Sequence, residues 1–251
     1  MCANTQFLWI FSFTASELCE KTGTLLVKIS EKPLWAGHFE IFFAKVNFGS
    51  ETDYMKASEL VIDNEAFTDL RGECEKIIDT HKRLPDLVFR RSFAKYFAIE
   101  YGHIYGNEFG AFLFAISGIF GDESVHFMTI DPPPESYYSQ CSFFGAASFE
   151  RSRLVKRYVP VLSRERNVPK LLAGVNVGVL WGSSLKWGIF CDRLSGEMAV
   201  IAVLGDIDVP TISGFRCMDP SGVSSYMNSQ YHWKPSAASD FTQRFLANYP
   251  I

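Results

Sequence analysis

The first third of the chain carries apolar stretches separated by glycine and proline, a pattern that is typical of β-strands. Residues 6–13 are apolar and aromatic, and residues 24–30 are rich in side chains that favour strands. Residues 38–48 partly alternate between apolar and polar positions. The pattern therefore predicts three strands between residues 6 and 48.

An amphipathic helix is predicted over residues 64–82. Its apolar side chains recur at three- and four-residue intervals, as one buried helix face requires. These positions are Phe67, Leu70, Cys74, Ile77, Ile78 and His81. Either Asp63 or Asn64 can cap the start of the helix, because both side chains can accept a hydrogen bond from a free backbone N–H group.

Residues 87–147 contain five stretches of strand-like composition joined by short connections that contain glycine. They predict an antiparallel β-meander. Its strands are expected at residues 87–92, 94–105, 109–120, 124–131 and 137–145. The three prolines at positions 132–134 predict a stiff, extended connector between the last two strands.

A second helix is predicted over residues 149–159, with Ser148 as its cap. Pro160 is expected to end or kink this helix, because proline lacks a backbone donor. Beyond it, residues 186–191 and 198–204 predict two strands joined by a short polar segment. The second of these strands is apolar throughout, which favours a central place in the sheet.

Two helices are expected at the end of the chain. Asp219 followed by Pro220 is a helix start signal, a capping side chain with proline in the first turn. That helix should reach about residue 231, and a last helix should run from residue 239 to about residue 248.

The order of elements predicts an α+β fold with mainly antiparallel β-sheets and flanking amphipathic helices. A length of 251 residues allows one large domain or two small ones. Sheet and helix follow each other twice, which suggests an N-terminal half at residues 1–147 and a C-terminal half at residues 148–251. One continuous domain is the alternative.

The cysteines and the apolar runs indicate the cellular compartment in which the protein is expected. Six cysteines lie far apart without a Cys-x-x-Cys pair, so we expect free, mostly buried thiols in a reducing environment. Residues 7–13 follow no basic residue, which favours a buried strand over a signal peptide. The longest uncharged runs, 109–121 and 171–185, are shorter than a membrane helix needs. We expect a soluble cytoplasmic protein.

Charge is distributed unevenly along the chain, although the net charge is only −4. Residues 51–79 hold nine acids and three bases, whereas residues 151–170 hold seven bases and one acid. Opposed patches of this kind steer charged partners toward a protein. The acidic stretch is a candidate surface for a basic partner, although a solvated helix face would have the same composition.

The basic stretch 151–170 raises the alternative of a nucleic-acid-binding module. Its candidate contacts are Arg151, Arg153, Lys156 and Arg157. The stretch lacks the interleaved aromatic and glycine residues of single-strand binders, and the chain is acidic overall. A solvated helix face is the simpler reading.

A search for catalytic and ligand-binding motifs finds no phosphate-binding glycine loop, no Gly-x-Ser-x-Gly and no His-Glu-x-x-His. Glu100, His103 and Glu108 come nearest to a metal cluster, but their spacing on a strand would place them on different faces. A hydrolase using Cys191 or His126 remains the enzymatic alternative. We expect neither a cofactor nor a metal.

Five segments carry a resemblance to the immunity proteins of bacterial polymorphic-toxin and type VI secretion systems. They are residues 7–13 (FLWIFSF), 63–70 (DNEAFTDL), 125–132 (VHFMTIDP), 187–193 (WGIFCDR) and 197–203 (EMAVIAV). The chain is most similar to the immunity family paired with restriction-endonuclease-like toxins. The resemblance implies an intracellular α+β protein without catalytic residues that binds and blocks a cognate toxin, which we expect to be a nuclease.

Acids of the first helix are the first candidates for the contact with a toxin, because a nuclease presents a cationic cleft. Acids and aromatic residues expected in exposed loops come next. The full candidate set is Glu65, Asp69, Glu73, Asp79, Glu135, Tyr137, Tyr138, Asp192 and Glu197. Exposed ion pairs contribute too little to hold a dimer, so we expect a monomer that forms a one-to-one complex with the toxin.

Overall fold

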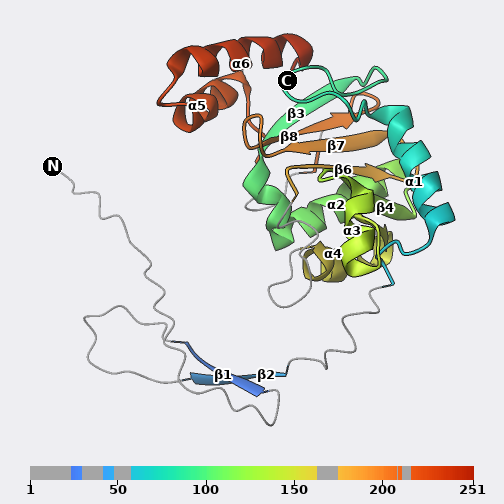
Figure 1. Cartoon of the computed structure of the whole chain (residues 1–251). Helices are drawn as coiled ribbons and strands as arrows, with labels where there is room; N and C mark the ends of the chain where they lie inside the picture. The colour runs from blue at the N-terminus through green and yellow to red at the C-terminus, as the bar shows by residue number, and fades with distance from the viewer. Residues whose placement is uncertain (1–23, 30–41, 48–57, 163–174, 208, 211–215) are drawn as a thin grey trace, which may run out of the picture. The chain divides into compact units, whose positions relative to one another are not determined.

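The chain forms two compact units, residues 1–57 and 58–251, which are described separately. The structure is a computed structural model (Figure 1). It describes residues 24–29, 42–47, 58–162, 175–207, 209–210 and 216–251.

The first unit contains an antiparallel strand pair, β1 (Thr24–Ile29) and β2 (Phe42–Asn47). Thr24 pairs with Asn47 at one end of the ladder and Ile29 with Phe42 at the other. These strands confirm the strand predictions for residues 24–30 and 38–48, with a later start for the second. The strand expected at residues 6–13 lies outside the described residues.

The second unit is built on a six-stranded antiparallel sheet with the strand order β3-β8-β7-β6-β4-β5. Its strands are β3 (Lys95–Glu100), β4 (Ser124–Asp131), β5 (Ala146–Glu150), β6 (Val177–Gly182), β7 (Trp187–Asp192) and β8 (Met198–Val203). The predicted α+β fold with antiparallel pairing is therefore confirmed. Both stretches of the sequence, 1–147 and 148–251, supply strands to this sheet.

Helices cover both faces of the sheet, which gives the unit three layers (Figure 1). One face packs against α2 (Asn107–Phe120), α4 (Leu154–Leu162) and a short 3-10 helix, Tyr101–Tyr105. The other face packs against α1 (Asn64–Ile77), α5 (Pro220–Gln230) and α6 (Pro235–Asn248). A further helix, α3 (Pro134–Cys141), connects β4 to β5.

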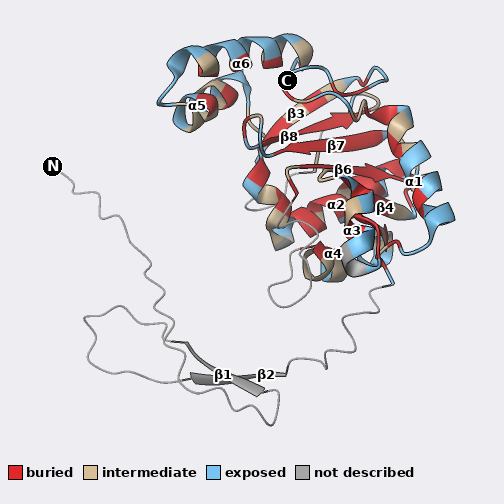
Figure 2. Ribbon diagram, in the orientation of Figure 1, coloured by how far each residue is buried: buried red, intermediate tan, exposed pale blue. Residues whose placement is uncertain are grey.

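Every residue of β6, β7 and β8 is buried, because side chains on both faces of these strands lie under helices (Figure 2). β8 lies between β3 and β7, which confirms the interior place in the sheet that its uniformly apolar sequence predicted. Gly182 ends β6 where the Asp122 carboxylate approaches closely and accepts hydrogen bonds from Trp187 Nε1 and Ser184 N, both at 2.6 Å. A side chain at this position would collide with Asp122.

The first predicted helix is confirmed with a shorter extent, from Asn64 to Ile77 instead of residue 82. Asp63 is its cap, and its Oδ2 accepts a hydrogen bond from Ala66 N at 2.8 Å. Phe67, Cys74 and Ile77 form its buried face. The helix lies with this face on the sheet, and its acids are therefore placed toward solvent or along its flanks.

The β-meander predicted for residues 87–147 is wrong in four places. Residues 87–92 form no strand beyond a single bridge between Phe89 and Ile78, and the strand expected at residues 94–105 ends at Glu100, where a 3-10 helix begins. Residues 109–120 belong to α2, and residues 137–141 belong to α3. In α2, exposed Phe114 and Ile119 obscured the helical spacing of its buried side chains. Pro134, expected in an extended connector, is instead the first residue of α3.

The helix predicted over residues 149–159 begins only at Leu154, because Phe149 belongs to β5 and Ser148 lies in the same strand rather than at a helix cap. A short 3-10 helix, Arg151–Arg153, separates the two. Pro160 does not end the helix, which continues to Leu162. Strand β6 lies within the uncharged run 171–185, for which no strand was predicted.

The predicted strand pair and both C-terminal helices are confirmed. β7 and β8 are adjacent and antiparallel, and Asp219 caps α5 by accepting a hydrogen bond from Gly222 N at 2.6 Å. α6 starts at Pro235, four residues before the expected position. None of the helices in the described residues has the length and apolar character that a membrane crossing requires.

Both edges of the sheet are bonded to neighbouring segments. At the β3 edge, Met218 N donates to Ala98 O at 2.7 Å. At the β5 edge, Val61 N donates to Ala146 O at 3.1 Å, and Ser148 N donates to Glu59 O at 2.7 Å. Covered edges reduce the opportunity for another chain to add a strand.

We predict that Asp63→Ala lowers the free energy of unfolding by about 1 kcal/mol, because it removes the acceptor for a free N–H group of α1. Asp63→Ser is the matched control, since serine caps a helix almost as well and should restore most of the loss. Urea unfolding followed by circular dichroism measures both. Equal losses in the two variants would contradict the capping role.

Candidate functional site

Three of the predicted contact residues form a continuous acidic stripe along α1. Glu65, Asp69 and Glu73 follow each other at four-residue intervals, and they therefore lie on one flank of the helix. Glu65 and Asp69 are exposed, and Glu73 is half-buried. In the following text, these three residues are called the acidic stripe.

The acidic stripe is unfavourable for the helix that carries it. Like charges four residues apart destabilise a helix by about 0.2–0.5 kcal/mol per pair, and the stripe contains two such pairs. Only Glu65 lies in the first turn, where a carboxylate favours the helix dipole. The stripe therefore contributes little to the stability of the fold.

Glu73 and Asp79 have partners within the protein. Trp181 Nε1 donates to Glu73 Oε2 at 3.4 Å, and His81 N donates to Asp79 Oδ1 at 3.2 Å. Asp79 also lies 3.9 Å from Arg90 Nη2. Asp79 follows the end of α1, so the structure places it beyond the stripe.

Helix α3 joins this region through Glu135. The Arg71 guanidinium of α1 binds Glu135 through Nη1 and Glu75 through Nε, the latter at 3.2 Å. These carboxylates raise the pKa of Arg71, with the hydrogen bond to Glu75 as the main cause. The structure therefore brings Glu135 beside α1, a contact that connects residues far apart in the sequence.

The two tyrosines of α3 differ in their surroundings. Tyr138 is 49% exposed, and its ring stacks on Phe144 with 4.7 Å between centroids. Tyr137 is buried in the core between α2, α3 and the sheet, so its predicted exposure is wrong. Neighbouring residues on a helix point in different directions, which explains the difference.

Asp192 is the last residue of β7, and Glu197 lies in the turn before β8, both apart from the acidic stripe. Asp192 is fully buried, contrary to the prediction of an exposed acid. Its carboxylate accepts hydrogen bonds from three backbone N–H groups, those of Leu84, Leu194 and Ser195, at 3.2, 3.0 and 2.9 Å. Glu197 is exposed. Asp192 therefore has a structural role, because these hydrogen bonds fix the turn that follows β7.

The described part of the basic segment is largely engaged by other side chains. Arg157 makes a two-pronged ion pair with buried Glu59, at 2.7 and 2.9 Å, which holds the pKa of Glu59 below its ordinary value. Arg153 lies 3.2 Å from Glu150, and Arg151 stacks over the ring of Phe114 at 4.3 Å. Lys156 is exposed. Residues 163–170 of this segment lie outside the described residues.

Cys191 and His126 do not form a catalytic pair, because they project from opposite faces of the sheet. Cys191 lies in the core on the α2 and α4 side, and burial strongly raises its pKa. The ring of His126 lies tilted beside that of Trp181 on the α1 side, with 5.4 Å between ring centroids, and burial lowers the pKa of His126. Its Nε2 lies 3.1 Å from Ser124 Oγ.

Metal ligands are not gathered anywhere in the described residues, where no group of three or more histidine, cysteine, aspartate or glutamate side chains could hold an ion. Glu100 ends β3, His103 lies in the following 3-10 helix, and Glu108 lies in α2.

We predict that iodoacetamide at pH 8 leaves Cys74 and Cys191 unmodified in the folded protein. Burial raises the pKa of Cys74 to about 12 and that of Cys191 further, so both thiols stay protonated and covered. Peptide mass spectrometry measures the labelling, and unfolding in urea should make both react. Rapid labelling of Cys191 in the folded protein would instead support the hydrolase alternative.

The chain matches no family model, no curated protein and no solved structure. The surface of α1 and α3 must therefore be judged from its own geometry. It combines exposed acids with an exposed tyrosine, a composition suited to contact with a cationic partner.

Proposed function

We propose that this protein is an immunity protein that binds and neutralises a cognate secreted toxin of the nuclease class. The acidic stripe on α1 is the observation that carries the proposal. Such a stripe is complementary to the cationic cleft with which a nuclease holds phosphates. Occupation of that cleft would block access of nucleic acid to the toxin.

The stripe is easier to explain by binding than by folding. Its like charges oppose the helix, and the buried face of α1 is supplied by other residues, Phe67, Cys74 and Ile77. Charge complementarity raises the rate at which partners meet, which is useful when the partner is lethal. We infer that the charge pattern serves capture of the toxin.

The dimensions of the surface suit a protein partner. α1 has 14 residues and is therefore about 21 Å long, and α3 lies against its side through the ion pair of Arg71 with Glu135. A typical interface occupies about 800 Å² on each partner. The exposed apolar side chains of Ile62 and Tyr138 add area that can be buried in the complex.

A helix-face contact fits this fold better than strand addition, because the edges of β3 and β5 are bonded to Met218 and to residues 59–61. The free protein is proposed to be a monomer that forms a one-to-one complex. We place it in the cytoplasm, a site supported by the three cysteines that the structure describes as unpaired, Cys74, Cys191 and Cys217.

The nucleic-acid alternative has less support, since the described arginines of the basic segment bind Glu59, Glu150 and the ring of Phe114. The enzymatic alternative lacks a pairing of Cys191 with His126. The immunity proposal is tested by co-expressing the protein with the product of the neighbouring gene at equal levels. The proposal predicts that the two proteins co-purify. Failure to bind that product, together with binding to random DNA or RNA at ~50 mM salt, would favour the nucleic-acid alternative.

Asp69→Lys provides a sharper test, because it should change stability and binding in opposite directions. The variant turns two repulsive pairs, with Glu65 and Glu73, into attractive ones, so the free energy of unfolding should rise by about 0.5 kcal/mol. Its association rate with the toxin should fall about tenfold at low salt, and less at high salt.

Asp240→Lys in α6 is the matched control, since it makes the same charge change at another exposed acid. It should leave the association rate near that of the unmodified protein. Stopped-flow measurements at two salt concentrations give the rates, and urea unfolding gives the stabilities. An Asp69→Lys variant that associates at the normal rate would remove the stripe from the binding surface.

A further inference from the structure

Three aromatic rings form a stack that leads from the core to the surface beside α1. Phe67 and Phe144 are parallel, with an interplanar angle of 0° and 4.2 Å between centroids. Tyr138 continues the stack on the other side of Phe144, at 4.7 Å and 28°. Phe67 and Phe144 are buried, so the first two rings belong to the core.

The backbone fixes this stack firmly. Phe144 N donates to Val61 O at 2.8 Å, which ties the middle ring to the segment before α1. Phe67 lies on the buried face of α1, and Tyr138 lies in α3. The outer ring is therefore held by its own helix and by a buried neighbour, so little side-chain freedom is left to lose on binding.

The outer ring presents an open aromatic face. One face of Tyr138 lies on Phe144, yet the residue is 49% exposed, so a large part of the side chain is left for contact with a partner. Phe67 and Phe144, the inner rings of the stack, are only 4% and 7% exposed, so Tyr138 differs from them in its access to solvent. A half-covered ring of this kind is a platform for a flat ligand.

The charges next to the platform are predominantly negative. Glu135 lies three residues before Tyr138 on α3, and thus on the same side of the helix. Glu135 and Glu75 share the single guanidinium of Arg71, so this group of three keeps one negative charge in excess. Carboxylates beside an aromatic face favour a cation over the ring.

We infer that Tyr138 binds an arginine side chain of the protein partner, with the guanidinium stacked on the open ring face. This inference rests on the proposed function, because it identifies the chemistry that the same surface recognises. Arginine fits better than lysine, since its planar guanidinium can stack on a ring and is more weakly hydrated than an ammonium group. The surface thus selects arginine-bearing segments among basic ones.

The test uses two peptides of equal length and charge, octa-arginine and octa-lysine, titrated into the full-length protein by isothermal calorimetry. The unmodified protein should bind the arginine peptide about two- to five-fold more tightly, the range expected for an exposed cation–π contact. Tyr138→Phe should keep this preference because it keeps the ring. Tyr138→Leu should abolish it while it still covers Phe144 with an apolar side chain.

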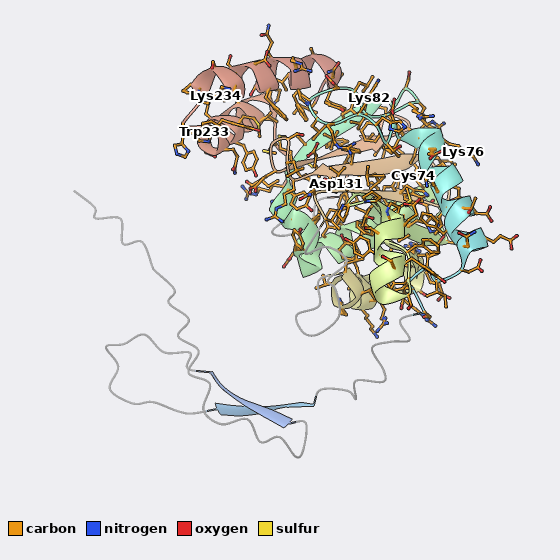
Figure 3. The ribbon with its side chains drawn as sticks, viewed as in Figure 1. Cys74, Lys76, Lys82, Asp131, Trp233 and Lys234 are labelled. Atoms are coloured by element: carbon orange, nitrogen blue, oxygen red, sulfur yellow. The ribbon has the colours of Figure 1, made fainter. Side chains whose placement is uncertain are left out.

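Trp233→Leu is the matched control for loss of an exposed aromatic residue. Trp233 is 69% exposed in the turn between α5 and α6, and Figure 3 places it on the opposite side of the unit from Lys76 of α1. This variant should retain the full preference for arginine. Thermal unfolding of each variant checks that all are folded during the titrations.

Two results would overturn the inference: equal affinity of the unmodified protein for both peptides, or an arginine preference that persists in Tyr138→Leu. The experiment is independent of the toxin, so its failure can be told apart from failure of the immunity proposal. Asp69→Lys should weaken the binding of both peptides by the same factor, because it changes only charge. The ratio of the two dissociation constants should therefore stay the same. If the protein prefers the arginine peptide but does not bind the neighbouring gene product, the arginine site at Tyr138 would be supported and the immunity function would be refuted.

Discussion

The structure of the second unit depends on burial of its sheet from both sides. β6, β7 and β8 expose none of their residues, so helices must cover both faces before the strands are stable. This requirement fixes the rotation of each covering helix. In α1, the placement of Phe67, Cys74 and Ile77 against the sheet leaves Glu65 and Asp69 in solvent (Figure 3 shows Cys74 on the sheet side and Lys76 on the outer side).

Packing therefore creates the proposed binding surface as a consequence of the core. The stack of Phe67, Phe144 and Tyr138 illustrates this connection, because its first two rings stabilise the core and its third reaches the surface. A surface built on such a scaffold changes little when a partner binds. The acidic stripe places like charges along one flank of α1 at a small cost in helix stability, and under the proposed function this charge serves capture of the partner.

Local signals predicted the elements that local interactions control. The Asp63 cap, the Asp219-Pro220 start signal and the apolar spacing of α1 each involve residues within a few positions. The two start signals were found as expected, and the apolar spacing was found up to Ile77, whereas His81, expected on the same face, lies beyond the helix and is exposed. Residues 109–120 were misassigned because apolar side chains occupy both the buried and exposed sides of α2, which weakens the periodicity. β6 was missed because its residues are apolar on both faces and show no alternation.

Contacts between distant residues could not be predicted in this way. Asp192 is buried where its carboxylate accepts a hydrogen bond from Leu84 N, and Arg157 is ion-paired with Glu59. In each case the partner lies about a hundred residues away in the chain. The acidic stripe itself was predictable, since a four-residue spacing on a capped helix defines one flank. Its neighbours Glu135 and Tyr138 were recognised only as candidates, because nothing in the sequence shows that α3 lies beside α1.

Hydrogen–deuterium exchange of the protein, alone and in complex with the product of the neighbouring gene, tests the central claim most directly. The claim is that the faces of α1 and α3 form the contact with a toxin. It predicts slower exchange on binding in residues 63–77 and 134–141, with little change in α5 and α6. Protection confined to α5 and α6, with unchanged exchange in α1 and α3, would contradict it.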